Sequence, residues 1–344
     1  MTMTRSLLPA LMLSACLSPL ARAQAPPKLD PQMKAVLDQL GALHGKPIPK
    51  LSAKEARMQP TPADAVKALL KKEGKSTDPE PVGNVQNTTI PGPGGAIPVR
   101  IYTPAGEGPF PVIVYIHGGG WVIATMDTYD STPRAMVNLT NAMVVSVEYR
   151  KAPEHKFPAA HEDSYAALQY VMKNAAKMKG DPKRVAVMGE SAGGNMATAV
   201  CMMARDRKGM MPLYEVLVYP VANSDLNTPS YKVNANAKPL NKPMMAWFFR
   251  NTVKSASDAN SPYLSVLRGN VKGLPPATVI TDEIDPLMSE GKAYADKLKK
   301  AGIAVQYRNY TGVAHEFFGM GAVVDKAKEA EQFAADGLKS AFNK

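Results

Sequence analysis

The sequence predicts an α/β fold with a mostly parallel central sheet that helices cover on both faces. Short, continuous apolar runs such as Pro111–Ile116 and Val185–Met188 are typical of strands buried on both sides. Helical stretches alternate with these runs, as the crossover connections of parallel strands require. The chain has 344 residues, is 45% hydrophobic and contains two cysteines. It is therefore long enough for one large core or two modest ones, and it is not a disulfide-dense scaffold.

The expected strands begin with a hairpin and continue as a series of buried runs. Asn84–Ile90 and Ala96–Tyr102 have strand composition and are joined by the turn-rich Pro91–Gly95. The later strands are expected at Pro111–Ile116, Met143–Tyr149, Val185–Met188, Tyr214–Tyr219, Thr278–Thr281 and Val305–Tyr310. The helices between or after them are expected at Pro158–Met178, Ala192–Ala204, Leu287–Ala301 and Val323–Phe342.

Two segments interrupt this alternation. Residues 24–81 are rich in Pro and Lys, with helical patches at Met33–Leu40 and Ala63–Lys72, and they predict an N-terminal helical arm. Residues 221–262 contain no buried strand and predict an insertion above the strand ends. We expect the arm and the insertion to form a cap on the main α/β domain, residues 82–344.

The insertion carries an aromatic and Met-rich helical stretch. Aromatic and Met side chains at helical spacing more often pack in the core than line a pocket. The alternative is that they form a wall of an acyl pocket. The side chains concerned are Met244, Met245, Trp247, Phe248 and Phe249.

The formal net charge of +11 does not by itself indicate a nucleic-acid partner. The lysines are scattered and interleaved with acids, as in Lys67–Glu73, and no basic run or aromatic-interleaved stripe occurs. A solvated basic surface is the interpretation we adopt, and no nucleic-acid partner is expected.

Gly189-Glu190-Ser191-Ala192-Gly193 is the strongest local signal for chemistry. It follows a buried strand directly and precedes a helix, which is the context of a nucleophile elbow. Small residues allow the sharp turn, and the helix N-terminus favours negative charge near the Ser191 hydroxyl. The alternative, a glycine-rich turn with a capping serine, would fit the five residues alone but not this context as well.

His117-Gly118-Gly119-Gly120-Trp121 follows the expected strand Pro111–Ile116. Three glycines let the backbone approach a reacting group closely and offer N–H groups to an oxyanion. We expect Gly118 and Gly119 to donate, together with the N–H of Ala192. The alternative is a phosphate-binding loop, but the spacing is not a nucleotide fingerprint and no lysine follows.

A serine nucleophile needs a base, and chain order identifies one. In this elbow the order is serine, acid, histidine, and of the five histidines only His315 follows Ser191. The acid should follow a strand and lie between them. Asp285 is the candidate, with Asp282 and Glu283 as runners-up, and a simple helix N-cap is the structural alternative for Asp285.

Together these motifs resemble the bacterial hormone-sensitive-lipase-like esterases of the α/β-hydrolase superfamily. The resemblance runs from about Val82 to the C-terminus. The motifs are HGGGW at 117–121, YRKAPEHKFPAA at 149–160 with Asp163, GESAGG at 189–194, DPL at 285–287 and HEF at 315–317.

The resemblance implies a capped α/β-hydrolase fold that hydrolyses small, often short-acyl carboxylic esters without cofactor or metal. It assigns Ser191, Asp285 and His315 as the triad. Gly118, Gly119 and Ala192 then form the oxyanion hole, and Trp121 and Glu190 contact the substrate. A homodimer is a further expectation. Glu190 stands where the family more often has aspartate, and we expect Arg150, Glu154 and Asp163 to brace the loop under the site by ion pairs.

Two other functions remain as alternatives. One is a catalytically silent binding protein on the same fold, as in plant hormone receptors that resemble this family and lack a working histidine; the presence of His315 argues against it. The other is a small-amide hydrolase that uses the same triad.

The first residues predict an export signal. Met1–Arg5 is basic, Ser6–Leu20 is apolar, and cleavage is expected after Ala23, so residues 1–23 would direct the protein to the bacterial periplasm or out of the cell. In the alternative, Leu13–Cys16 is a lipobox and the protein is anchored through a lipid on Cys16. An uncut N-terminus is the third option. No apolar run is long enough to span a bilayer.

Overall fold

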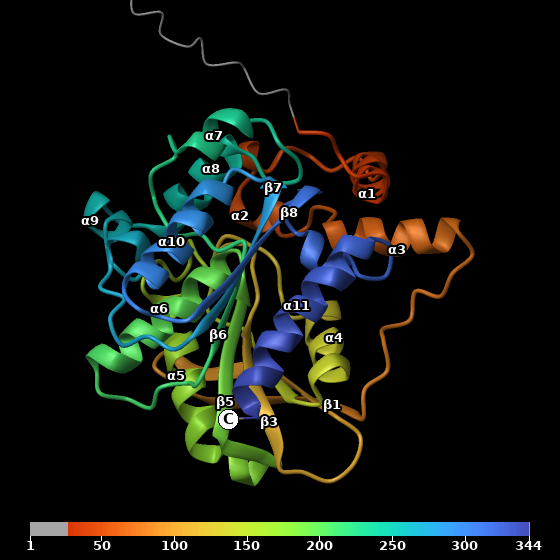
Figure 1. Ribbon diagram of the computed structural model, residues 1–344. Helices are drawn as coiled ribbons and strands as arrows, with labels where there is room; N and C mark the ends of the chain where they lie inside the picture. Colours follow the sequence, from red (N-terminus) through yellow and green to blue (C-terminus); the bar gives the residue numbers. More distant parts are fainter. Residues whose placement is uncertain (1–26, 344) are drawn as a thin grey trace, which may run out of the picture.

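The computed structural model describes residues 27–343, which form one eight-stranded sheet between two layers of helices (Figure 1). The predicted leader and Cys16 lie outside these residues. The strands are β1 (Asn84–Gly92), β2 (Gly95–Thr103), β3 (Phe110–Ile116), β4 (Met143–Val147), β5 (Gly180–Glu190), β6 (Glu215–Val218), β7 (Ala277–Ile284) and β8 (Val305–Ala314).

The sheet has the order β1-β2-β4-β3-β5-β6-β7-β8. Strands β3 to β8 are parallel to their neighbours, whereas β2 pairs antiparallel with both β1 and β4. The α/β fold with a mostly parallel sheet is thus confirmed. The carboxyl ends of the parallel strands share one edge, so the loops after β3, β5, β7 and β8 meet there.

Four of the helices that cover the sheet connect its strands, and the fifth follows the last strand. They are α4 (Ser131–Thr140), α5 (Ala159–Asn174), α6 (Ala192–Asp206), α10 (Met288–Lys300) and α11 (Asp325–Phe342). Helix α4, the crossover between β3 and β4, was not among the predicted helices. Its polar composition and Pro133 hide it, although it buries Met136 and Val137.

Each face of the sheet belongs to its own core cluster. Along β3, Val112, Val114 and Ile116 belong to the cluster that also contains residues of α5, α6 and α10, while Ile113 and Tyr115 belong to the cluster that contains residues of α4 and α11. This alternation is the period of two expected for a strand buried on both sides. Among the helices of residues 27–343, none combines the length and the apolar composition of a membrane-spanning segment.

The N-terminal segment and the insertion lie together near the carboxyl edge of the sheet. The first holds α1 (Pro31–Ala42), α2 (Ala53–Ala56) and α3 (Pro62–Lys72), and the second holds α7 (Pro229–Val233), α8 (Lys242–Thr252) and α9 (Ala256–Ala259). They touch each other, because the indole Nε1 of Trp247 donates a hydrogen bond to the carbonyl of Leu51 at 3.0 Å. The domain boundaries given above stay predictions.

Candidate active site

Ser191 occupies a strained turn between β5 and α6. Its φ and ψ are 57° and −118°, a conformation that non-glycine residues rarely adopt. A Cβ on Gly189 would meet the backbone of Gly193, and one on Gly193 would meet the carbonyls of Ile116 and His117. Both flanks of the turn therefore require glycine, which explains the spacing of the motif.

Ser191, His315 and Asp285 come together from three loops. His315 Nε2 lies 2.9 Å from Ser191 Oγ, and His315 Nδ1 lies 2.7 Å from Asp285 Oδ2. Asp285 follows β7 and His315 follows β8. The backbone N–H of Leu287 donates to the other oxygen of Asp285 at 2.8 Å, so the carboxylate is held from both sides.

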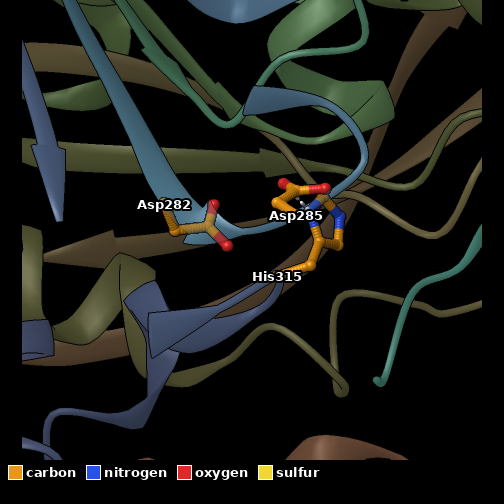
Figure 2. Close-up of side chains that lie close together, drawn as sticks. All are labelled: Asp282, Asp285 and His315. Atoms are coloured by element: carbon orange, nitrogen blue, oxygen red, sulfur yellow. Dashed lines mark hydrogen bonds and ion pairs between the residues drawn. The ribbon is translucent and has the colours of Figure 1, made fainter. Parts of the chain in front are cut away.

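The two runners-up for the acid have other positions. Glu283 accepts a hydrogen bond from the N–H of Gly312 at 2.8 Å. Asp282 is completely buried and lies beside Asp285, as Figure 2 shows, but neither of its oxygens has a hydrogen-bond partner in the described part of the chain. Burial, reinforced by the charge of Asp285, raises the pKa of Asp282 well above its ordinary value.

Asp282, Asp285 and His315 also form the single cluster within residues 27–343 whose spacing would suit a metal ion, since their nearest ligand atoms lie within 4.8 Å of one another. Two of these three side chains already hydrogen-bond to each other (Figure 2). That bond is the one expected between a base and the acid that orients it.

The electrostatics favour a protonated state of His315 during a reaction. Burial by itself would lower its pKa, but the negative charges of Asp285 and Glu316 outweigh burial and raise the pKa above the ordinary value. An imidazolium formed at this position is therefore stabilised by its surroundings.

The glycine loop after β3 is shaped for close approach. Gly119 and Gly120 have φ values of 96° and 57°. The Tyr149 hydroxyl donates to the carbonyl of Gly118 at 2.8 Å, which holds this carbonyl inside the protein. Within the described residues, no group accepts a hydrogen bond from the N–H of Gly118 or Gly119.

A cavity of 1240 Å³ opens onto Ser191 and His315. Its walls come from the N-terminal segment, the glycine loop and the insertion. Two of the five insertion side chains considered in the sequence, Met244 and Phe248, line it, whereas Met245, Trp247 and Phe249 do not. The apolar lining includes Leu37, Leu40, Ile48, Ile123, Leu240, Met244 and Phe248.

Trp121 and Glu190, both expected to contact substrate, do not line this cavity. Trp121 is buried and stacks on His161, with ring centroids 6.3 Å apart. Glu190 accepts hydrogen bonds from the hydroxyls of Tyr115 and Tyr219, and burial raises its pKa to about 7. This geometry gives both residues a supporting position behind the site.

The bracing ion pairs expected in the segment 149–163 are present. Arg150 forms a bidentate pair with Asp163, with both N–O distances at 2.8 Å. Glu154 pairs with Arg57 of the N-terminal segment. That second partner had no sequence signal, because residues 24–80 match no motif.

Glu316 is a site residue that the sequence reasoning did not single out. It follows His315 directly, lines the cavity, and accepts a hydrogen bond from the Tyr129 hydroxyl at 2.6 Å. Its place in the HEF motif was the available signal.

Comparison with known proteins agrees with this geometry. The family described as alpha/beta hydrolase fold matches residues 113–319. Carboxylesterase NlhH of Mycobacterium tuberculosis is 40% identical over 252 residues, which are 72% of this chain and 79% of that protein. Ethyl acetate hydrolase of Pseudomonas putida is 32% identical over 320 residues, 90% of this chain and 98% of that protein. The solved structure of a hyperthermophilic esterase from Pyrobaculum calidifontis has a TM-score of 0.83 and 39% identity, covering 91% of this chain and 98% of its own.

Proposed function

The chain belongs to the hormone-sensitive-lipase-like esterases of the α/β-hydrolase superfamily and is a serine carboxylesterase, and on this premise we propose that Ser191, His315 and Asp285 carry out its reaction. The observation that supports the assignment is the continuous chain of hydrogen bonds from Ser191 Oγ through His315 to Asp285, at 2.9 and 2.7 Å. It is the geometry that a serine nucleophile, its base and an orienting acid require.

In the proposed mechanism Ser191 Oγ attacks the ester carbonyl while His315 Nε2 removes its proton. His315 then gives this proton to the departing alcohol, which leaves an acyl-enzyme. Water, activated by the same histidine, attacks the acyl group and releases the acid. Asp285 keeps the imidazole in the tautomer that presents its unprotonated Nε2 to serine, and stabilises the imidazolium.

The oxyanion of each tetrahedral intermediate is assigned to the N–H groups of Gly118, Gly119 and Ala192. The first two make no hydrogen bond within residues 27–343, so they are available to an oxyanion. Donors fixed before the reaction need not reorganise when charge develops, and one such donor is typically worth about a hundred- to a thousand-fold in turnover.

Short- to medium-chain acyl esters are the proposed substrates. The name of the Pseudomonas putida relative specifies ethyl acetate, and that relative aligns over 90% of this chain. The cavity walls are largely apolar near Ile123, Met244 and Phe248, which suits an acyl chain.

Export remains a proposal that rests on the basic and apolar N-terminus, with lipid attachment at Cys16 as its alternative. N-terminal sequencing of the protein recovered from a periplasmic fraction would distinguish cleavage after Ala23 from an intact or lipidated terminus.

The homodimer also stays a prediction. Sedimentation measurements of the molar mass in solution would test it.

The decisive experiment measures hydrolysis of p-nitrophenyl esters from acetate to palmitate, with Ser191→Ala as the control. Turnover should be highest for short acyl groups, and the variant should lose at least about 10³-fold in kcat. Unchanged turnover in Ser191→Ala would refute the assignment. A fluorophosphonate should label the wild-type protein at Ser191; a protein that neither turns over esters nor becomes labelled would instead be a silent binder. Matched ester and amide substrates would test the small-amide alternative.

A further inference from the structure

Glu316 places a carboxylate in the cavity next to the reacting atoms. Its Oε1 lies 4.0 Å from His315 Nε2, the nitrogen that also contacts Ser191 Oγ at 2.9 Å. The side chain is 22% exposed and lines the cavity, so it is accessible to a bound molecule. The Tyr129 hydroxyl donates to Oε1 at 2.6 Å and fixes the orientation of the carboxylate.

The second oxygen, Oε2, accepts no hydrogen bond from any residue between 27 and 343. Glu316 also differs in charge pairing from the other two acids of the cavity wall. Glu148 pairs with Lys151, and Glu154 pairs with Arg57, whereas Glu316 has only His315 beside it. An acceptor with a free oxygen therefore faces the cavity.

The position of Glu316 relative to the reaction follows from the role proposed for His315. His315 Nε2 passes its proton to the oxygen of the departing alcohol, so the alcohol part of the ester must lie against this nitrogen. Glu316 stands beside the same nitrogen, and it therefore faces the alcohol part close to the ester oxygen.

The charges around the cavity decide which alcohols fit. An anionic group near the ester oxygen would be repelled by Glu316. A cationic alcohol would first have to pass the exposed lysines of the cavity wall, Lys46, Lys50 and Lys238. A neutral hydroxyl meets neither barrier, and it can donate to the free Oε2 in a charge-assisted hydrogen bond.

We propose that Glu316 is a specificity residue that selects esters whose alcohol carries a second, neutral hydroxyl near the ester oxygen, as in monoesters of diols and polyols. This inference rests on the proposed function, because it uses His315 as the acid that protonates the leaving alcohol. Glu316 faces the Tyr129 hydroxyl and His315, with the carboxyls of Glu190 and Asp285 and the His117 ring nearby.

The test compares acetate esters that share the acyl group and differ only in the end group of the alcohol part. In 2-hydroxyethyl acetate a hydroxyl replaces the terminal methyl of propyl acetate, and acetoxyacetate supplies an anionic analogue. The measured quantities are the ratios of kcat/KM for the hydroxyl and anionic esters to that for propyl acetate, at pH 8. The variants are Glu316→Gln, which keeps the shape, and Glu316→Gly, which suits the φ of 72° at this position. Glu107→Gln, an exposed residue outside the cavity lining, controls for net charge.

The ratio of kcat/KM for 2-hydroxyethyl acetate to that for propyl acetate should fall about 10-fold in Glu316→Gly. It should fall less in Glu316→Gln, because the amide carbonyl still accepts a hydrogen bond. The acetoxyacetate-to-propyl ratio should rise several-fold in both. Opposite changes in two ratios cannot arise from general damage to the site. Unchanged ratios, with propyl acetate still hydrolysed, would overturn this inference alone. Undiminished hydrolysis of propyl acetate by Ser191→Ala would instead refute the proposed function.

Discussion

At the scale of single residues, the acid side of the site contains two neighbouring buried carboxyls with different surroundings. Asp285 receives hydrogen bonds from His315 Nδ1 and the N–H of Leu287. Asp282 receives none among the described residues, and burial and the charge of Asp285 raise its pKa well above the ordinary value. When this pair holds a proton, we therefore expect it to reside on Asp282, since two adjacent charges in a dry interior repel strongly.

Substitution by asparagine separates the two carboxyls. Asp285→Asn should lower kcat by about 10⁴-fold, because the amide presents a donor to His315 Nδ1 and favours the wrong tautomer. Asp282→Asn replaces one neutral group by another of the same size, and kcat at pH 7 should stay within about 3-fold of wild type. Steady-state kinetics on a p-nitrophenyl ester would decide; a larger loss in Asp282→Asn than in Asp285→Asn would reverse the assignment.

At the scale of elements, the strand–turn–helix around Ser191 depends on backbone packing that tolerates no side chain. A Cβ on Gly193 would collide with the backbone carbonyls of Ile116, the last residue of β3, and of His117, and neither carbonyl belongs to a flexible side chain. Gly193→Ala should therefore cost about 3 kcal/mol of unfolding free energy and lower kcat. The control is Gly41→Ala in α1, where nothing lies within 4 Å and the change should be neutral or slightly stabilising. Equal denaturation midpoints for the two variants would contradict this account.

Most of the helices and strands could be predicted from the sequence, and the exceptions have physical reasons. Continuous apolar runs predicted central strands such as β3 and β4, because these strands are buried on both faces. Strand β1 is mostly exposed, and its composition and the turn that follows it predicted it instead. Strand β5 begins at Gly180, whereas the apolar run predicted a start at Val185. The prediction began too late because residues 181–184, Asp-Pro-Lys-Arg, carry no apolar signal. Helix α4 was missed because its composition is largely polar and it contains Pro133, although six of its ten residues are buried.

Within the site, chain order and strand context were enough to select Ser191, Asp285 and His315, because the elbow requires a defined succession of loops at one sheet edge. The direction in which a side chain points leaves no comparable pattern in the sequence. Trp121 and Glu190 belong to the motifs but point into the protein, while Glu316, which faces the cavity, has no spacing rule that would identify it. The N-terminal segment and the insertion were expected to form a cap together, but their individual contacts, such as the hydrogen bond from Trp247 to Leu51, had no sequence signal for the same reason.

At the scale of the whole molecule, buried carboxyls link stability to pH. Glu215, at the start of β6, is fully buried, and burial raises its pKa to about 8. Glu331 on α11 is also mostly buried, with a pKa raised to about 8 by burial and by neighbouring acids. A carboxyl whose pKa is higher in the folded state binds its proton more tightly there than in the unfolded chain. Its contribution to stability is therefore complete below pH 4.5 and is lost as pH rises through about 8.

Glu215→Gln should remove this loss, because an amide stays neutral at every pH. At pH 5 the variant and wild type should differ by no more than about 1 kcal/mol in unfolding free energy. At pH 9 the variant should be more stable by on the order of 3 kcal/mol, since wild type must then either ionise a buried group or retain its proton against the solution pH. Urea titrations at the two pH values measure the difference, with Glu107→Gln as an exposed control. A variant no more stable than wild type at pH 9 would contradict this account, and it would mean that Glu215 becomes solvated when it ionises. Any loss of stability at alkaline pH would then come from other buried acids such as Glu331.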